Sequence, residues 1–576
     1  MNRLFTGAIA LGLFGAALVG TSAESYALGW PEKYEGVMLQ GFYWDSYKDT
    51  KWTNLESQAD ELSKYFKLIW IPNSGKCEYM GYMPRYWFTN HNSAFGTEKE
   101  LLSMISTFKA KGTGFIADCV INHRNGVKGW YDFPVEEWNG RTWSIGLDGI
   151  CSNDEMAYSA GQPKPTGNPD TGDNFDGCRD LDHTNANVQD NCKNYVKCLQ
   201  EKYGYAGMRY DMVKGYGGQY NKIYNTYANV EYSVGEYWDG NYDAVAAWIE
   251  ATGKTSAAFD FPCKYAMNEA FTSGDLTKLV WKAQGTTPQP AGLIHWWYPR
   301  YSVTFVDNHD TYRDGSKFTG NVIAANAFIL MSPGTPCVFL PHYQQYKEEI
   351  QNLINIRNAA GLNNQSSVKV LQTTRDCYMA EVEGTKGKVV VKIGSAWVSP
   401  SGYSDSDIKA VGSDYCVWTK VNVKPTEPVV ETAPDHFYII GQANGNDWHY
   451  ATGVEMKGNN GVFTATVDMQ IPPATTKAAA DPYAYFSFAK SLATSWDELN
   501  SVGNRYAPAA DTEIVVGGPS VKLEVSANPA QAKAYKVKPG KYDVEVHWAN
   551  KTITLRSAGS SAVEEIESIA AAPEYY

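Results

Sequence analysis

Four short blocks of the sequence place acidic or imidazole side chains directly after apolar runs. Cleavage of a glycosidic bond needs one carboxylate that attacks or stabilises the anomeric carbon and one carboxylic acid that protonates the leaving oxygen. The chain offers candidates for both groups. The blocks are Asp118–His123, Gly207–Gly215, Val234–Trp238 and Phe305–Asp310.

A single block of this kind is weak evidence, because an Asp that follows a strand often caps the next helix instead of doing chemistry. Four blocks in order along the chain are much stronger evidence. The carboxyl ends of barrel strands form the catalytic face of a (β/α)8 barrel, so acids at these positions would meet in one mouth.

The elements that must position these blocks alternate along residues 36–362. Short apolar runs at 36–39, 68–71, 114–117, 206–209 and 303–306 alternate with longer amphipathic stretches such as Glu98–Lys111. This alternation predicts a parallel sheet, and the length favours a closed (β/α)8 barrel over residues 24–362. A doubly wound open sheet is the alternative. Residues 124–182 are rich in Gly, Asn, Asp and Pro and are expected to form a functional insertion.

After the barrel, the hydrophobic pattern of the sequence changes. Alternating short runs predict a small antiparallel β domain at 363–422, and three prolines among Glu and Thr indicate a linker at 423–434. A second β module is expected at 435–556, a β-sandwich that ends in a hairpin of 542–548 with 552–555. The small, acidic residues 557–576 are expected to be a flexible tail.

The N-terminal residues and the net charge restrict the expected location of the protein and its possible binding partners. Residues 1–23 have the three-part pattern of a secretory signal peptide, so we expect a secreted or cell-surface protein without a membrane span. A formal charge of -13 argues against nucleic acid as a partner. The 18 Trp and 39 Tyr suit sugar rings, although large cores use them as well.

The ten cysteines match no small disulfide scaffold or zinc pattern. Cys119 and Cys337 sit in apolar runs and are expected to be buried free thiols. Disulfide bridges could form among the cysteines of a loop-rich stretch, and the pairing is left open. These are Cys151, Cys178, Cys192 and Cys198.

In order and spacing, the four blocks resemble the signature regions of the α-amylase family of glycoside hydrolases, and the plant-type members are the most similar. The resemblance covers residues 37–420. It extends to the segments Gly81–Pro84, Ala117–Asp118, Asp180–His183, Ala258–Phe261 and Pro333–Pro336. It implies a secreted, endo-acting enzyme that hydrolyses α-1,4 bonds of starch, glycogen and maltooligosaccharides with retention of configuration, expected as a monomer.

The resemblance also implies the roles of the acids. Asp211 would be the nucleophile, Glu236 the general acid/base, and Asp310 the residue that holds ring hydroxyls in the transition state. Arg209, on the same strand face as Asp211, would keep that carboxylate ionised, and Tyr237 with Trp238 would help to keep Glu236 protonated.

Further residues are expected to bind substrate. His123 and His309 would donate hydrogen bonds to sugar hydroxyls and Tyr82 would stack on the ring, although each histidine alone could be a satisfied buried residue. The remaining expected substrate-binding residues are Arg209, Lys214, Trp238 and, as a surface platform of plant-type enzymes, the pair Trp296 and Trp297.

The resemblance implies a bound Ca²⁺, an ion that takes six to eight oxygen ligands. The expected ligands are the side chains of Asn122, Asp170 and Asp180 and the backbone carbonyls of Asp173 and Gly215. Many relatives carry His where this chain has Gly215, but plant-type members share the Gly and only a carbonyl is needed. Taken singly, these Asp and Asn residues could simply make turns.

The C-terminal β module resembles in texture the starch-binding sandwiches of bacterial outer-surface proteins, and contains Trp448, Trp496 and Trp548. An immunoglobulin-like spacer is the alternative. Residues 572–576 resemble the start of a Bacteroidetes secretion tail. Two rival functions stay open: another enzyme of the family (a transglycosylase, an exo-amylase or a branch-cutting enzyme), and a non-catalytic starch-capturing protein, although the latter would be expected to lack one of the three acids.

Overall fold

The computed structural model describes residues 29–559, apart from 78, 154, 176, 283–285, 314, 425–432, 472–481, 501–502, 525–531 and 549–550. The expected signal peptide at 1–23 lies outside the described residues. Most of the expected linker and tail, 425–432 and 560–576, also lie outside them.

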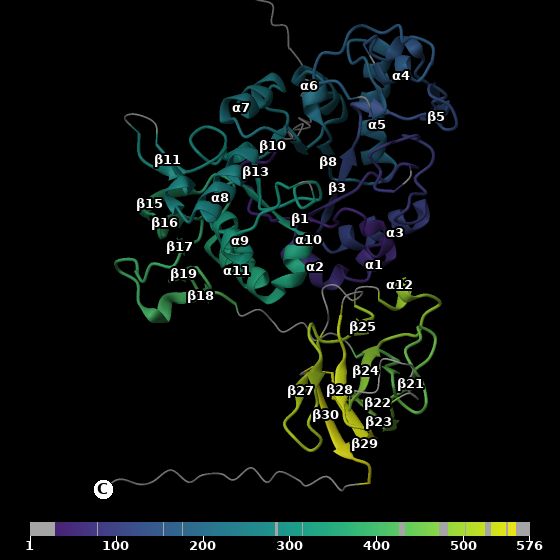
Figure 1. Ribbon diagram of the computed structural model, residues 1–576. Helices are drawn as coiled ribbons and strands as arrows, with labels where there is room; N and C mark the ends of the chain where they lie inside the picture. Colours follow the sequence, from purple (N-terminus) through teal and green to yellow (C-terminus); the bar gives the residue numbers. More distant parts are fainter. Residues whose placement is uncertain are drawn as a thin grey trace, which may run out of the picture.

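Eight parallel strands close into a barrel (Figure 1). Every neighbouring pair in the ring is parallel, including the closing pair of β1 with β14. The predicted (β/α)8 barrel is therefore confirmed, and the open-sheet alternative is wrong. In spatial order the strands are β1 (Met38–Gln40), β14 (Thr335–Phe339), β13 (Ser302–Phe305), β10 (Ala257–Phe259), β9 (Tyr232–Gly235), β8 (Gly207–Tyr210), β3 (Gly114–Cys119) and β2 (Leu68–Ile71).

The strands are short and buried on both faces, as expected for a parallel sheet that helices cover. Helices connect the strands and surround the barrel (Figure 1). They are α1 (Trp52–Glu56), α2 (Ala59–Tyr65), α3 (Glu98–Ala110), α5 (Ala186–Glu201), α6 (Gly218–Ala228), α7 (Tyr242–Ala251), α8 (Phe261–Ser273), α9 (Val322–Leu330), α10 (Leu340–Gln345) and α11 (Lys347–Ala360).

Helix capping distinguishes an acid with a structural role from the acids of the four blocks. Asp260, just after β10, accepts a hydrogen bond from the Cys263 backbone and caps α8. The helices that follow β9 and β13 are capped instead by Asn241 and Asn321. Glu236 and Asp310 are therefore not helix caps, and their carboxylates are available for other interactions.

Between β3 and α5 the chain leaves the barrel as an insertion. The two-stranded pair β4 (His123–Arg124) and β7 (Arg179–Asp180) forms its base, with His123 opposite Asp180. The hairpin of β5 (Glu136–Trp138) with β6 (Arg141–Trp143) and the short helix α4 (Glu155–Ser159) lie between them in the chain. The antiparallel base pair brings the two ends of the insertion together beside the barrel mouth.

A five-stranded antiparallel sheet follows the barrel, in the order β15–β16–β17–β19–β18. Successive residues of a strand face opposite sides. Tyr378 and Ala380 of β16 join the barrel's core, whereas Cys377 and Met379 pack in a small core on the other side. The sheet is thereby fixed to the barrel through one face. Its strands are β15 (Ser367–Thr374), β16 (Cys377–Glu383), β17 (Lys388–Ile393), β18 (Ile408–Gly412) and β19 (Tyr415–Thr419).

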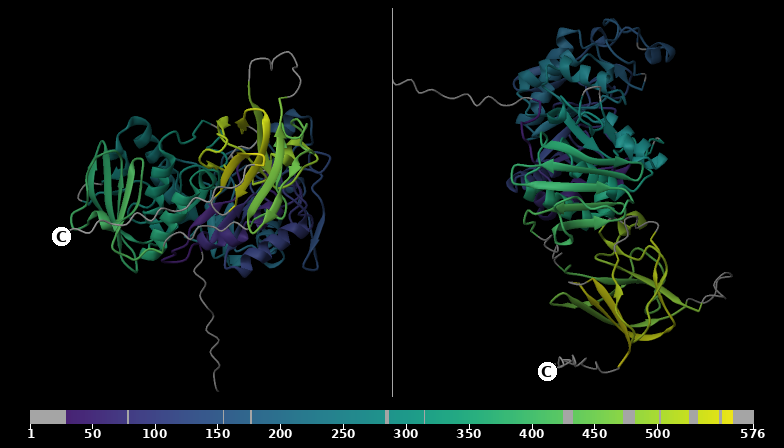
Figure 2. Two further views of the ribbon diagram at one scale, coloured as in Figure 1. Left: turned by 90° about the horizontal axis from the view of Figure 1, so that it is seen from below. Right: turned by 90° about the vertical axis from the view of Figure 1, so that its left-hand side faces the viewer.

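The C-terminal module consists of two sheets around a separate core, the β-sandwich that the sequence predicts (Figures 1 and 2). The hairpin of β29 with β30 is confirmed. One pair, β26 with β28, is parallel in this mostly antiparallel module. One sheet contains β20 (Tyr438–Gly441), β21 (Val454–Glu455), β24 (Ala484–Ala489), β25 (Arg505–Tyr506), β26 (Thr512–Glu513) and β28 (Tyr535–Val537); the other contains β22 (Lys457–Asn459), β23 (Val462–Met469), β27 (Val521–Lys522), β29 (Gly540–His547) and β30 (Thr552–Ser557).

The cysteines are buried, and Cys119 and Cys337 are free thiols as predicted. Cys192 and Cys198 on α5 are also free, so neither takes part in a bridge. Within the part of the chain that the structure describes, no helix combines the length and the apolar character needed to cross a bilayer.

A buried ion pair holds the insertion against the segment that follows β2. The Glu136 carboxylate lies 2.6 Å from Arg124 Nη2, and both side chains are 1% exposed. The same carboxylate accepts hydrogen bonds from the backbone N–H groups of Trp87, Phe88 and Thr89. Glu136 is therefore the point at which two segments far apart in the chain are tied together.

We predict that Glu136→Gln lowers the free energy of unfolding by about 3 kcal/mol, because it leaves the buried Arg124 charge without its counter-charge. Chemical denaturation of both proteins measures the difference. Glu137→Gln is the matched control, since the neighbouring Glu137 is exposed. Equal stability of the two variants would contradict the structural role of Glu136.

Candidate active site

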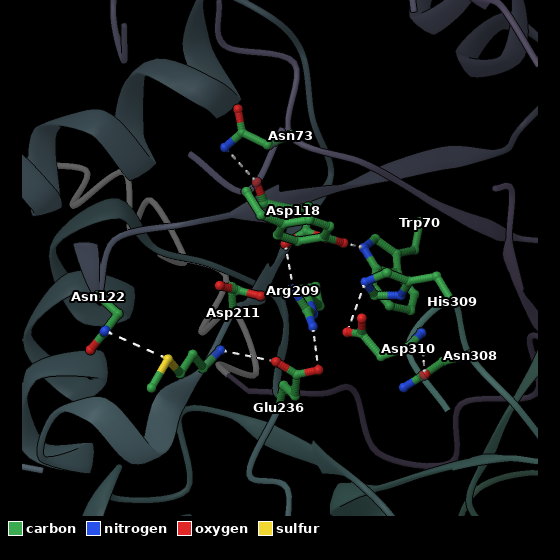
Figure 3. A network of polar contacts seen from close by, with 12 residues as sticks. Trp70, Asn73, Asp118, Asn122, Arg209, Asp211, Glu236, Asn308, His309 and Asp310 are labelled. Atoms are coloured by element: carbon green, nitrogen blue, oxygen red, sulfur yellow. Dashed lines mark hydrogen bonds and ion pairs between the residues drawn. The ribbon is translucent and has the colours of Figure 1, made fainter. Parts of the chain in front are cut away.

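The three acids of the sequence blocks meet at the carboxyl ends of three barrel strands (Figure 3). Asp211 follows the last residue of β8, Glu236 follows the last residue of β9, and Asp310 lies five residues beyond the end of β13. Asp211 and Glu236 are 7% and 6% exposed, so both residues are largely shielded from water.

Arg209 connects the acids. Its side chain is fully buried, and its Nη1 lies 2.7 Å from Asp118 Oδ1 and 2.6 Å from Asp211 Oδ1. Its Nη2 lies 2.6 Å from Glu236 Oε1. A single guanidinium therefore holds Asp211 and Glu236 as close neighbours. This observation agrees with the expectation that a positive charge lies beside Asp211.

Asp118 is a member of this cluster that the sequence reasoning did not include among the site residues. Besides Arg209, its carboxylate accepts hydrogen bonds from Trp70 Nε1 at 3.1 Å and from the Tyr82 hydroxyl at 2.8 Å. Asp118 and Arg209 are direct neighbours in the register of β3 and β8. The signal was present, because Asp118 opens the first of the four blocks.

Three carboxyl groups share one buried cation, and this shapes their proton affinities. Burial raises the pKa of Glu236 to about 8; Asp211 and Asp310 act in the same direction, while Arg209 opposes the rise. Burial likewise raises the pKa of Asp118 to about 6, against the effect of Arg209. Glu236 therefore keeps its proton at neutral pH. Burial is the main cause, and desolvation is the effect that the sequence analysis expected Tyr237 and Trp238 to help supply.

Asp310 has different neighbours. Burial acts to raise its pKa, but His309 and Arg313 outweigh this effect and the pKa is lowered, so Asp310 is ionised. His309 Nε2 lies 3.1 Å from Asp310 Oδ2, and Gln40 Nε2 lies 3.1 Å from His309 Nδ1. Burial lowers the pKa of His309 to about 4, so its ring is neutral. With Nδ1 accepting from the Gln40 amide, Nε2 carries the hydrogen, which makes no hydrogen bond within the described residues.

Parallel rings line the mouth beside Asp310. Tyr82 stacks on His309 with ring centroids 5.2 Å apart, and Trp44 is parallel to both. The Arg313 guanidinium lies 3.5 Å from the Trp44 ring and donates to Asp310 Oδ1 from Nε and Nη2. Trp44 and Arg313 were missed by the sequence analysis; only the closeness of Arg313 to Asp310 in the chain could have indicated it.

The other expected substrate-binding residues lie at or near this mouth. His123 Nε2 donates to the Tyr82 backbone carbonyl at 2.9 Å, so this N–H is not free for a sugar hydroxyl, and the ring stacks on Phe175. Trp238 stacks on Phe261 and donates to the Tyr265 hydroxyl. Lys214 Nζ lies 3.5 Å from Asp239 and 3.7 Å from Asp173, so it joins the barrel to the insertion.

Trp296 and Trp297 lie away from the acids, in the segment that leads to β13. Both are exposed, Trp296 at 39% and Trp297 at 80%. Trp296 has a left-handed backbone with φ 60° and packs on His295 and Tyr242. Two adjacent indole rings at the surface suit a flat ligand.

Oxygen-bearing side chains converge where the insertion meets the barrel. Asn122 Nδ2 donates to Asp180 Oδ1 at 2.9 Å, and side-chain ligand atoms of Cys151, Asp170 and Asp180 lie within 4.8 Å of one another. A Cβ on Gly215 would lie 2.0 Å from Asn122 Oδ1, so a larger residue here would require the Asn122 side chain to move. The Asp173 N–H donates to the Lys214 carbonyl, next to Gly215.

The donor set fits a hard cation. Asn122 Oδ1 and Asp170 Oδ2 are buried without a hydrogen-bond partner, an arrangement that costs free energy unless a ligand satisfies them. Burial raises the pKa of Asp170, which means that its hydrogen bonds do not fully replace the hydration that the carboxylate has lost. These residues would suit Ca²⁺, which takes oxygen ligands in flexible geometry. The Cys151 thiol in the same group is not a ligand that the sequence predicted.

A closed parallel barrel with a buried proton-bearing carboxyl, an adjacent carboxylate and a third acid at its carboxyl end has the groups that a glycoside hydrolase needs. The family comparison agrees. The model described as "Alpha amylase, catalytic domain" matches residues 76–378, and that described as "Alpha-amylase C-terminal beta-sheet domain" matches residues 359–419. The chain is a glycoside hydrolase and belongs to the α-amylase family.

Similar proteins occur in plants and bacteria. "Probable alpha-amylase 2" of Arabidopsis thaliana is 32% identical over 409 residues, which are 67% of this chain and 94% of that protein. "Alpha-amylase 3, chloroplastic" of the same plant is 32% identical over 406 residues; the match spans 66% of this chain but only 44% of that protein. "Glucan 1,4-alpha-maltotetraohydrolase" of Stutzerimonas stutzeri is 28% identical over 433 residues, 67% of this chain and 74% of that protein.

Proposed function

We propose that this protein is a secreted, endo-acting α-amylase that hydrolyses internal α-1,4 bonds of starch, glycogen and maltooligosaccharides with retention of configuration. The observation that carries the proposal is the contact of one buried guanidinium, Arg209, with both Asp211 and Glu236. Retaining enzymes need their two carboxyl groups close together, because one attacks the sugar directly instead of activating a water between them.

The reaction proceeds in two displacements. The Asp211 carboxylate forms a bond to the anomeric carbon while the glycosidic C–O bond breaks, and Glu236 gives its proton to the departing oxygen. A water molecule then attacks the same carbon, Glu236 takes its proton, and the bond to Asp211 breaks. Two inversions at one carbon retain the configuration. The pKa of Glu236, which burial raises to about 8, suits a group that must hold its proton in the first step.

The remaining mouth residues bind the sugar. Asp310 accepts hydrogen bonds from ring hydroxyls, and the neutral His309 donates from Nε2 to a hydroxyl beside the cleaved bond. The ring of His123 lines the same part of the mouth. The exposed face of Tyr82 stacks on the ring. Arg209 orients the carboxyl groups, while Lys214 and Trp238 at the rim contact the neighbouring sugars, and Trp296 with Trp297 forms a separate surface platform for starch.

We further infer that Ca²⁺ binds between insertion and barrel through the side chains of Asn122, Asp170 and Asp180 and the carbonyls of Asp173 and Gly215. The ion supplies positive charge that joins the insertion to the barrel. Residues on both sides of this junction, His123 and Lys214, contact the substrate mouth. Secretion, through the segment 1–23, and a monomeric state complete the proposal.

A second candidate function is exo attack with products of one size. It is favoured by the similarity to a protein whose name describes a maltotetraohydrolase. A time course of products on amylose separates the two functions. Oligosaccharides of mixed length at the earliest times support endo attack, whereas a single product size from the start supports exo attack.

We predict that Asp211→Asn removes essentially all hydrolysis of soluble starch, at least about 10⁴-fold, because the amide cannot form the covalent intermediate. Reducing-sugar release measures the loss, and circular dichroism tests the fold. Asp60→Asn is the matched control, since the Asp60 side chain is 90% exposed. Turnover by Asp211→Asn close to that of the control would refute the assignment of the nucleophile.

The raised pKa of Glu236 predicts the alkaline limb of the pH profile. The acid form is populated below about pH 8, so kcat/KM on maltoheptaose should fall tenfold per pH unit above that value as the proton is lost. Initial rates across the alkaline range measure this. A profile that stays level to about two units above this pKa would show that Glu236 is not the proton donor.

Removal of Ca²⁺ with a chelator should lower Tm by about 5 °C, because an ion that binds only the folded state stabilises it by mass action. Differential scanning calorimetry, with metal analysis to confirm depletion, measures the shift. Asp170→Asn should melt near the chelated protein and respond weakly to the chelator. An unchanged Tm after confirmed depletion would argue against the site.

A further inference from the structure

The C-terminal β-sandwich has a surface pocket of about 330 Å³ that lies outside the barrel. Figure 1 places α12 (Trp496–Leu499), which contributes to the pocket, at the end of the module that is nearest to the barrel. The pocket combines two indole rings with charged and hydroxyl groups. Its described lining residues are Trp448, Tyr485, Trp496, Arg505, Asp511 and Lys533, with two alanines.

The two tryptophans of the pocket differ from Trp548, the third tryptophan of the module that the sequence offered. Trp548 is 2% exposed and packs on Phe437 and Phe463 in the sandwich core, so it cannot bind a ligand at the surface. Trp496, by contrast, is 40% exposed, and Trp448 is half-buried. Trp448 packs with one part against a small buried cluster of the module, whereas the exposed part of Trp496 requires another explanation than core packing.

The pocket residues are held by the fold before any ligand arrives. Tyr450 packs edge-on against Trp496 at 5.9 Å. Gly441 has φ +103°, and a Cβ there would come within 3.1 Å of Trp448 Cζ2, so the glycine leaves room for this indole. Tyr485 lies on β24, on the face opposite to the core residues Ala484 and Phe486. Rings fixed in this way lose little conformational entropy when a ligand binds.

The polar groups of the pocket define the ligand's chemistry. Arg505 is 8% exposed; its Nε donates to Ser487 Oγ and its Nη1 donates to Asn500 Oδ1. Its guanidinium also lies 5.3 Å from the Trp448 ring. Lys533 and Asp511 add one positive and one negative group. Charges of both signs beside flat rings suit a neutral ligand with many hydroxyl groups, because its hydroxyls both donate and accept.

We propose that this pocket is a second glucan-binding site, in which an α-glucan chain places the apolar faces of its sugar rings on Trp448 and Trp496 and its hydroxyls against Arg505, Asp511 and Lys533. The choice of an α-glucan as occupant depends on the proposed function of the barrel. The site binds the polymer that the barrel cleaves, and thereby keeps the enzyme on insoluble substrate.

The test measures adsorption of the full-length chain to starch granules, in an Asp211→Asn background so that the probe is not consumed. Addition of Trp496→Ala should weaken adsorption about fivefold to tenfold, as expected for the loss of one stacking ring. Trp397→Ala is the matched control, because Trp397 is fully exposed on another domain, and should adsorb like the parent. Trp448→Ala provides a second pocket variant.

With Asp211 intact, Trp496→Ala should leave kcat/KM on soluble maltoheptaose unchanged and slow only the hydrolysis of granules. The two proposals can therefore fail separately. If the parent hydrolyses no starch, the proposed function of the barrel is refuted. Adsorption to granules is measured independently of turnover and tests the second site. Thermal unfolding confirms that each variant is folded. Starch adsorption of Trp496→Ala and Trp448→Ala equal to that of Trp397→Ala, or equal adsorption of the parent to cellulose, would overturn the α-glucan site.

Discussion

The active site depends on one buried positive charge that is shared by several carboxyl groups. Arg209 is fully buried and contacts Asp118, Asp211 and Glu236. One guanidinium cannot compensate three buried negative charges, because each buried carboxylate without a partner costs several kcal/mol. The cluster therefore retains a proton, and the group with the strongly raised pKa is Glu236. Burial, which Arg209 offsets only in part, thus raises the pKa of Glu236 to about 8 and suits this residue to donate a proton.

The closed barrel makes such a cluster attainable. Parallel strands present their carboxyl ends on one side, so residues at the ends of β3, β8, β9 and β13 meet although they are far apart in the chain. Register fixes the details: Asp118 lies opposite Arg209, and Arg209 lies opposite Val234, two residues before Glu236. A shift of one residue in any of these pairs would turn the side chains away from the mouth.

The sequence was sufficient to predict those parts of the site that lie directly after barrel strands. The barrel, its strand ends and the positions of the three acids could be predicted because each acid follows an apolar run. The contacts of Trp44 and Arg313 could not, since they depend on the path of irregular loops. The burial of Trp548 can be predicted, because it continues the inward alternation of Tyr542, Val544 and Val546. Trp496 sits on a short helix in a loop region, where no periodicity indicates exposure.

The two arginines at the barrel mouth differ in their exposure to water. Arg209 has no access to water, so moving it would leave uncompensated charge on three carboxyl groups at a high cost in free energy. The Arg313 side chain is 47% exposed and donates to the same Asp310 carboxylate that a sugar's hydroxyls would reach. Water can replace Asp310 as its partner at little cost, because exposed ion pairs contribute about 1 kcal/mol or less. The buried arginine is therefore fixed among the three carboxyl groups, while the exposed one contributes to the lowered pKa of Asp310 and can exchange this carboxylate for water.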